Sequence, residues 1–426
     1  MLQASGGVRS LDRPVCPRTG WTWPAISLAG GRPRWTRLLA ASLGCVLAAA
    51  CTSPDSHLAT ATSRASGSRI ERAYWPTAGW RTAPPDQQGM DPAMVGELDA
   101  KVPDRYPQVR SLLVVRHGYL VYERYWQGVG PSDGHDVRSV TKSVVSALVG
   151  IALRDRHLQG LDQTVGELLA DHLPATADPR LRQVTLKQLL TMTSGLAGDD
   201  SSLGGDDQLF DRLFQSRDWV RHILSRRLVS KPGTEFAYSS AGSHLLSAIV
   251  ADASGQSTLG FARTQLFGPL GIAADHALEQ TIRHWPPTQA ELAAFGRAPV
   301  AWPRDPQGYH FGGAFLKLPA RDLAKFGFLY LNGGRWDRTQ VVPAEYVAAS
   351  TRPQSEPSRG PGDYGYQWWV TNETGHDSFR AMGFGGQLIQ VIPELDLDVV
   401  ITCDPDQERS DAPNLVGETI VPAVTS

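Results

Sequence analysis

The sequence predicts an α/β fold of the α+β type, in which an antiparallel sheet is flanked by helices and carries an inserted helical lobe. Two pairs of strand-like runs lie near opposite ends of the chain, each joined by a short turn. The first pair is Ser111–Arg116 with Tyr119–Trp126, and the second is Gln387–Ile392 with Leu397–Thr402. Between the pairs the apolar periodicity is helical, and strands do not alternate regularly with helices. This pattern argues against a doubly wound parallel sheet.

Four segments between the hairpins are predicted to be helices. Ser139–Leu153 is almost wholly apolar, whereas Leu209–Arg227 and Gly242–Ala253 are amphipathic. Pro319–Leu331 begins with a proline and is followed by a glycine pair, which are ordinary start and stop signals. A further run, Tyr364–Trp369, is predicted as an aromatic strand, either lining a substrate pocket or lying in the sheet core.

The N-terminal part of the chain indicates export. Residues 1–50 contain six arginines and one acidic residue, and end in a 13-residue apolar run after Arg37. That run is too short for a bilayer, which needs about 20 residues, but it suits a signal-peptide core. Cys51 follows at once, so the segment resembles a bacterial lipoprotein signal that leaves a lipidated cysteine; simple secretion is the alternative.

This leader gives a domain division into a signal peptide at 1–50, a flexible linker at 51–68 and a folded body at 69–426. With Cys51 lipidated, Cys403 is the only other cysteine of the mature chain, so an internal disulfide is excluded.

The composition gives no reason to expect a nucleic acid, a metal or a cofactor. The formal net charge is −2 over 426 residues, which does not attract a polyanion. The nearest histidines along the chain, His276 and His284, are too far apart for ligand spacing on one helix. The sequence also contains neither a P-loop nor a G-x-G-x-x-G motif.

Two serine motifs compete as the source of a nucleophile. Gly130-Pro-Ser132-Asp-Gly134 fits the G-x-S-x-G pattern of a nucleophile elbow. An elbow needs a helix that begins directly after the serine, however, and Asp133–Asp136 intervene here. We therefore predict an ordinary loop around Ser132.

Ser139-Val-Thr-Lys142 is the stronger motif. Residues three apart share one face of a helix, so the Lys142 amine can reach the Ser139 hydroxyl. Lys142 is flanked by apolar residues, and burial lowers the pKa of an amine until it can accept the serine proton. Ser139 in the first helical turn also leaves backbone N–H groups for a developing oxyanion. The alternative is a helix-capping serine beside a lysine whose ammonium reaches solvent.

Five further sequence segments, which follow Ser139–Lys142 along the chain, favour the catalytic interpretation. Together with Ser139–Lys142 they resemble the serine β-lactamase and penicillin-binding family, and within it the class C β-lactamase-like branch with its esterases and 6-aminohexanoate-dimer hydrolases. The segments are Val184–Gly195, Pro232–Ser240, Leu266–Ile272, Arg321–Gly327 and Arg380–Gln387.

The resemblance implies a role for each matching residue. Ser139 would be the acylated nucleophile, Lys142 its base, and Tyr238 the residue that shuttles protons to the leaving group and activates the deacylating water. A phenol titrates near pH 10, so Tyr238 is expected to need Lys142 or another cation nearby.

The resemblance also implies the groups around the reacting carbonyl. The oxyanion hole would combine the N–H of Ser139 with that of Phe384, and Gly386 is the alternative to Phe384. Ser240, Gly383 and Gly386 would contact the substrate.

Three positions depart from the pattern of the family. Ser240 stands in place of an asparagine, and Ala381 occupies the place of the Lys or His of the K/H-T-G motif, with Arg380 adjacent. The glutamate of the class A Ω-loop is missing, because Glu167 begins a sequence without the required asparagine. These departures leave the acylation machinery intact and favour an esterase or amidase over an efficient β-lactamase.

The predicted protein is thus an exported serine hydrolase that cleaves a small ester or amide through a serine acyl-enzyme. Membrane attachment through Cys51 is expected, and no nucleic acid partner. The alternative is a non-catalytic member of the family that binds cell-wall peptide or a protein partner.

Overall fold

A computed structural model describes residues 72–407 and 410–425. The predicted signal peptide and linker, including Cys51, lie outside these residues. The described helices include none that is both long and apolar enough to cross a membrane.

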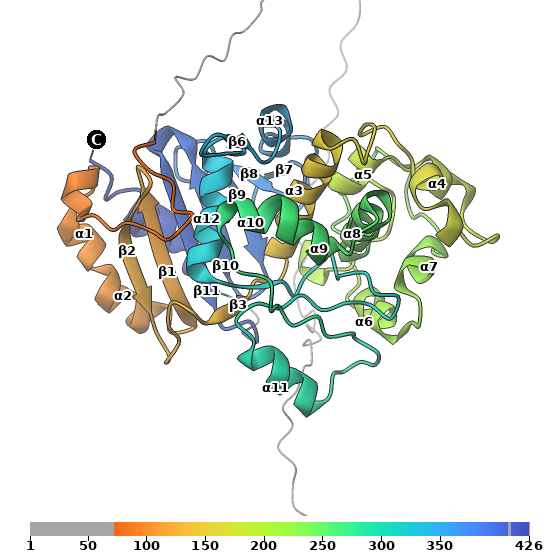
Figure 1. The fold of residues 1–426 in the computed structure, drawn as a ribbon, viewed down its shortest axis with the longest axis horizontal. Helices are drawn as coiled ribbons and strands as arrows, with labels where there is room; N and C mark the ends of the chain where they lie inside the picture. The colour runs from red at the N-terminus through yellow and green to blue at the C-terminus, as the bar shows by residue number, and fades with distance from the viewer. Residues whose placement is uncertain (1–71, 408–409, 426) are drawn as a thin grey trace, which may run out of the picture. The chain divides into compact units, whose positions relative to one another are not determined.

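The central element is a seven-stranded antiparallel sheet, as the sequence predicts. Both predicted hairpins are confirmed. The first strand of the N-terminal hairpin also pairs with the last strand in the sequence, so strands from both ends of the described chain lie next to each other in the sheet. The strand order is β2-β1-β11-β10-β9-β8-β7 (Figure 1). The strands are β1 Val109–Arg116, β2 Tyr119–Tyr125, β7 Asp363–Tyr364, β8 Trp369–Thr371, β9 Ser378–Gly383, β10 Gln387–Ile392 and β11 Leu397–Cys403.

In the described part of the chain, two short two-stranded sheets lie outside the main sheet. One of them pairs the strand just before Ser139 with a strand more than 180 residues later in the chain, directly before the helix α12 (Ala320–Leu331). These strands are β3 Gly134–Asp136 with β4 Lys317–Pro319, and β5 Arg335–Trp336 with β6 Thr339–Gln340.

The helices cover both faces of the sheet and form a separate lobe at one side (Figure 1). Each predicted helix is present, although one of them is divided. The helices are α1 Pro92–Gly96, α2 Leu98–Arg105, α3 Val140–Arg154, α4 Val165–Leu168, α5 Leu186–Leu190, α6 Gln208–Gln215, α7 Trp219–Leu224, α8 Ser240–Ser254, α9 Thr258–Ala262, α10 Gly268–Leu270, α11 Gln289–Arg297, α12 Ala320–Leu331 and α13 Ala344–Ser350.

Alternation along the strands divides the core into two clusters. In β1, Leu112 and Val114 belong to the cluster beneath α1 and α2, whereas Leu113 and Val115 belong to the larger cluster with α3 and α12. All four side chains are fully buried. Successive residues of a strand point to opposite faces, so a strand that is apolar throughout is covered on both sides.

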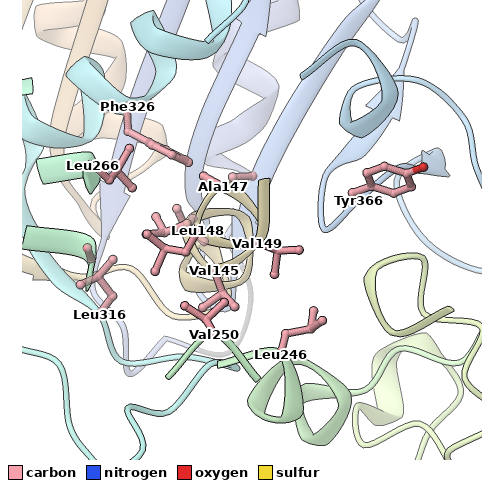
Figure 2. Packing of buried hydrophobic residues seen from close by; sticks show 14 of the residues in the cluster. Val145, Ala147, Leu148, Val149, Leu246, Val250, Leu266, Leu316, Phe326 and Tyr366 are labelled. Carbon is pink, nitrogen blue, oxygen red and sulfur yellow. The ribbon is translucent and has the colours of Figure 1, made fainter. Parts of the chain in front are cut away.

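The helix α3 lies at the centre of the larger cluster. Figure 2 shows Val145, Leu148 and Val149 of α3 with Val250 of α8 and Phe326 of α12 around them. An almost wholly apolar helix is stable only when it is surrounded, because burying apolar surface contributes about 25 cal/mol per Å². The burial of α3 on all sides fixes Ser139 and Lys142 at its N-terminal end.

The prediction of one continuous helix over Leu209–Arg227 is wrong. The chain leaves the helix between α6 and α7, and Asp218 caps α7 by accepting a hydrogen bond from Arg221 N at 2.9 Å. Ser216 Oγ also accepts from Asp218 N at 3.2 Å. Side chains of Ser and Asp compete with the helix for backbone groups, so Ser216 and Asp218 were a sequence signal for the break.

The aromatic run Tyr364–Trp369 is not one strand. It forms the ends of β7 and β8 with a chain reversal between them, in which Gly365 N donates to Trp368 O at 2.8 Å. The residues of the run are buried in two clusters, which confirms the core alternative for Trp368; a pocket-lining role stays a prediction. Trp368 lies in the larger core cluster, whereas Tyr364 and Trp369 pack against Tyr238.

Candidate active site

Ser139 stands at the N-terminus of α3, at the end of a strained loop. The preceding residue, Arg138, has a left-handed backbone with φ of 49°, which costs a residue other than glycine about 1–3 kcal/mol. Asp136 offsets this cost by accepting from Arg138 N at 3.0 Å, and its carboxylate lies 3.4 Å from the Arg138 guanidinium. Thr141 Oγ1 also donates to Arg138 O at 2.6 Å. This loop presents the partly exposed Ser139 at the helix end.

Lys142 has three oxygen partners. Its Nζ lies 2.9 Å from Ser139 Oγ, 3.1 Å from Ser240 Oγ and 2.7 Å from the carbonyl oxygen of Gly313. A neutral amine has two N–H donors and one lone pair, and a carbonyl oxygen can only accept. Gly313 therefore fixes one N–H, and the lone pair is left to face one of the two hydroxyl groups.

The environment of Lys142 favours the neutral amine. The side chain is 1% exposed, and burial lowers the pKa of Lys142 to about 8. Asp199 and Asp200 act in the opposite direction, because their negative charges favour the ammonium. The loss of hydration agrees with the expectation from the sequence, but the immediate partners of Nζ are polar groups rather than the flanking valines.

Tyr238 lies over the same site from the segment that precedes α8. The Lys142 Nζ stands 4.7 Å from the centre of its ring, and Ser139 lies near enough to its hydroxyl to lower the pKa of Tyr238. Burial nevertheless raises the pKa of Tyr238 well above its ordinary value, and the influence of Ser139 opposes this only in part. The cation expected for Tyr238 is present, but it faces the ring, so Tyr238 rests as a protonated phenol.

The segment that carries Tyr238 is held by backbone bonds to two earlier segments of the chain. Ala237 N donates to Met192 O at 2.8 Å, and Asp199 N donates to Tyr238 O at 3.0 Å. Met192 belongs to the segment Val184–Gly195, which the sequence resemblance included without any indication of its role.

Asp199 is a site residue that sequence analysis missed. Its buried carboxylate accepts from Ser240 N at 2.8 Å and from Ala241 N at 2.9 Å, at the first turn of α8. The carbonyl of Gly313 was missed as well, because a backbone oxygen leaves no side-chain signal in a sequence.

The strand β9 ends directly beside the Ser139 loop. A Cβ on Gly383 would lie 2.3 Å from Val137 O and 3.0 Å from Arg138 Cβ, so only glycine allows this approach. Gly386 N donates to Gly383 O at 3.2 Å inside the turn after β9. This bond occupies the Gly386 N–H, which weakens the case for Gly386 as the oxyanion donor.

Gly386 itself is buried under the C-terminal segment. A Cβ on Gly386 would lie 2.5 Å from Ser410 Cβ and 3.1 Å from Cys403 Sγ, so the residue has a packing role in the turn. Its contact with a substrate stays a prediction, as do the contacts of Ser240 and Gly383.

The residues at the K/H-T-G position of β9 present no free cation to the site. Ala381 is buried in the larger core cluster, and Met382 packs beside Tyr238 and Trp369. Arg380 points to the opposite face from Ala381, as strand alternation predicts. Its guanidinium donates to Glu373 Oε2 at 2.8 Å and to Pro361 O at 2.6 Å.

The two motifs that sequence analysis set aside, around Ser132 and Glu167, have local structural roles. Ser132 lies in an exposed turn, where Gly130 N donates to Asp133 Oδ2 at 2.7 Å. Glu167 closes a capping box with Thr164 at the start of α4. Within residues 72–407 and 410–425, no group of three His, Cys, Asp or Glu side chains is placed to hold a metal ion.

The chain matches a known family. The family model described as Beta-lactamase matches residues 107–416, which is more than half of the chain. The chain therefore belongs to the β-lactamase family, and the resemblance inferred from its motifs is confirmed.

Its relatives include a hydrolase and an esterase. The chain is 24% identical to the 6-aminohexanoate-dimer hydrolase of Paenarthrobacter ureafaciens, over 68% of this chain and 71% of that protein. It is 32% identical to Esterase EstB of Burkholderia gladioli, over 38% of this chain and 44% of the esterase. A solved structure from Bacillus anthracis, assigned as a 6-aminohexanoate-dimer hydrolase, has a TM-score of 0.61 at 19% identity and covers 83% of this chain and 87% of that one. The structural match shows the fold alone.

Proposed function

We propose that this member of the β-lactamase family is a serine hydrolase that cleaves a neutral ester or amide through an acyl-enzyme on Ser139. The observation that carries the proposal is the contact of the buried Lys142 amine with Ser139 Oγ at 2.9 Å, with the Tyr238 ring 4.7 Å from the same amine. A lysine with a pKa of about 8 has a substantial neutral fraction near neutral pH and can take the serine proton.

The reaction then proceeds in two halves. Lys142 takes the proton of Ser139 as Oγ attacks the carbonyl carbon, and Tyr238 gives its proton to the leaving group as the scissile bond breaks. The proton on Lys142 restores the Tyr238 hydroxyl. Water then attacks the serine ester, and its proton reaches the neutral Lys142 through Tyr238, which takes the water proton as it passes its own hydroxyl proton to the amine. The proton on Lys142 then returns to Ser139 Oγ as the ester bond breaks and the acid is released.

The oxyanion of each tetrahedral intermediate lies between the start of α3 and the end of β9. Ser139 N–H and Phe384 N–H are the donors in this proposal. Backbone donors at such a site need no reorganisation, and one of them contributes about a hundred- to a thousandfold to kcat. The close approach of Gly383 to Val137 supports this placement.

The alternative is a non-catalytic protein that binds cell-wall peptide. The complete set of Ser139, Lys142 and Tyr238 in mutual contact argues against it. The test is turnover of p-nitrophenyl butyrate by the purified protein. Release of p-nitrophenol that stops after one equivalent, or none at all, would favour the binding protein.

The substrate is expected to lack a carboxylate next to the scissile bond. β-Lactams carry a carboxylate, which the family holds with the K/H-T-G strand, and a charge-assisted hydrogen bond to it contributes about 1.5–3 kcal/mol, or ten- to 150-fold. Here Ala381 faces the core and Arg380 is engaged with Glu373. We therefore expect kcat/KM for p-nitrophenyl butyrate to exceed that for nitrocefin on the same preparation.

A gain-of-function variant sharpens this prediction. Ala381→Lys adds a cation at the position that the family uses, but the side chain starts from the buried core, so the melting temperature is measured as well. A folded Ala381→Lys enzyme should cleave nitrocefin faster relative to the ester. Ala381→Met serves as the control for side-chain length without charge. Nitrocefin cleaved tenfold faster than the ester by the wild-type enzyme would refute the argument.

We also propose that the protein is exported and attached to a membrane through a lipid on Cys51. Several acyl chains on one cysteine, at about 0.8 kcal/mol per buried methylene, are sufficient for stable anchoring. Cys51→Ala should release the protein from the membrane fraction or block its maturation, as measured by fractionation and N-terminal mass. A soluble wild-type protein whose N-terminus is not residue 51 would overturn this proposal.

A further inference from the structure

We propose that Asp199 is a positioning residue of this site, whose carboxylate holds the first turn of α8, and with it Ser240, against the Ser139–Lys142 pair and places a negative charge in the surroundings of Lys142. The inference rests on the proposed roles of Ser139 and Lys142 and adds a residue that touches neither the substrate nor the reacting atoms.

The first line of support is the geometry of the carboxylate. Asp199 is 5% exposed, and its two oxygens accept separately from Ser240 N at 2.8 Å and Ala241 N at 2.9 Å. Ser239 Oγ takes the next N–H of the turn, that of Gly242, at 3.1 Å. The first N–H groups of a helix have no partner within it, so Asp199 and Ser239 together complete the start of α8.

The second line of support is that Asp199 bonds to both sides of the catalytic segment. Its backbone N–H donates to Tyr238 O at 3.0 Å, while its carboxylate holds the backbone of Ser240. Ser240 Oγ in turn lies 3.1 Å from Lys142 Nζ. A displacement of Asp199 therefore reaches Lys142 through a single intervening residue.

The third line of support is charge. Burial raises the pKa of Asp199, but the two N–H bonds, Lys142 and Arg226 oppose this rise. Both oxygens accept N–H donors, an arrangement that the ionised carboxylate satisfies best. The charge of Asp199 raises the pKa of Lys142 and so opposes the effect of burial on the amine.

The other groups that face Lys142 do not replace this charge. From the segment before α8, Tyr238 is neutral because burial raises its pKa. From the 199–200 turn, Asp200 acts on Lys142 in the same direction as Asp199 but less strongly. Ser139 from α3, Ser240 from α8 and the Gly313 carbonyl carry no charge. Arg226 acts on Asp199 rather than on Lys142.

The test is the pH dependence of kcat/KM for p-nitrophenyl butyrate in four proteins: wild type, Asp199→Asn, Asp200→Asn and Asp218→Asn. The wild-type rate should rise through an apparent pKa near 8 as Lys142 loses its proton. Asp199→Asn removes the negative charge, so this rising limb of the pH profile of kcat/KM should move to lower pH by about one unit. The side-chain NH₂ of the new asparagine also meets the N–H of Ser240 or Ala241, two donors that cannot bond to each other. The start of α8 is then held less firmly, and kcat at the plateau should fall about three- to tenfold.

The two other variants are graded controls. Asp200→Asn should move the limb in the same direction by less. Asp218→Asn makes the same chemical change at the cap of α7, where asparagine is an equally good cap, and should change neither quantity. Melting temperatures establish that each variant is folded.

A folded and active Asp199→Asn enzyme whose kcat/KM rises through the same apparent pKa as that of the wild type would overturn the proposal. The serine mechanism would still stand. If Asp199→Asn does not fold, Asp199→Glu takes its place, since it keeps the charge and displaces it. In Asp199→Glu the apparent pKa of kcat/KM should stay near 8 while kcat falls. An Asp199→Glu enzyme with the kcat of the wild type would overturn the positioning role. Undiminished activity in Ser139→Ala would instead overturn the proposed function.

Discussion

Ser139→Ala and Lys142→Ala are each expected to lower kcat by at least about a thousandfold, and the double variant is expected to be no worse than either single one. The two side chains act as one unit, because the hydroxyl is a nucleophile only when the amine at 2.9 Å takes its proton. The measurement is hydrolysis of p-nitrophenyl butyrate by proteins of equal melting temperature.

Ser132→Ala is the matched control for this result. Ser132 lies in an exposed turn, so turnover should stay within about threefold of wild type, which is less than the 1.4 kcal/mol that a tenfold change represents. A folded but inactive Ser132→Ala enzyme would transfer the role of nucleophile to the G-x-S-x-G motif. Effects of Ser139→Ala and Lys142→Ala that multiply in the double variant would show that they act independently.

Gly383→Ala is expected to lower kcat about a hundred- to a thousandfold with a smaller change in KM. The added Cβ would lie 2.3 Å from Val137 O, and a backbone atom cannot rotate away as the end of a side chain can. Either β9 or the Ser139 loop must move, and Phe384 N–H then no longer faces the oxyanion together with Ser139 N–H. Such overpacking costs about 1–3 kcal/mol of stability, so thermal unfolding is measured alongside kcat.

Gly160→Ala provides the control for the loss of a glycine. A Cβ on Gly160 meets no atom within 4 Å, and its backbone is not left-handed, so both kcat and the melting temperature should be unchanged. If Gly383→Ala keeps full activity, the end of β9 does not supply the oxyanion donor.

The features that sequence analysis predicted are those set by local spacing. Two residues three apart on an apolar helix must share a face, so the contact of Lys142 with Ser139 followed from the motif alone. Strand alternation likewise placed Arg380 opposite Ala381. Both hairpins were also indicated, because period-two patterning and turn residues are properties of neighbouring residues.

The features that it missed depend on contacts between distant segments. Asp199 reaches Ser240 across 41 positions, and one aspartate among many acidic residues gives no sign of that contact. The state of Tyr238 was also missed, since motif order places a cation nearby without showing that it faces the ring. The break between α6 and α7 differs from these, because Ser216 and Asp218 carried a local signal that outweighed the amphipathic pattern.

The central claim is that Ser139 becomes acylated, and covalent labelling tests it most directly. The folded protein is treated with a fluorophosphonate at a pH near 8 and digested, and the modified residue is located by mass spectrometry. We predict one stoichiometric adduct on Ser139, absent from Ser139→Ala, strongly slowed in Lys142→Ala and retained in Ser132→Ala. An adduct on Ser132 or another serine, or none from a preparation that hydrolyses p-nitrophenyl butyrate, would contradict the account.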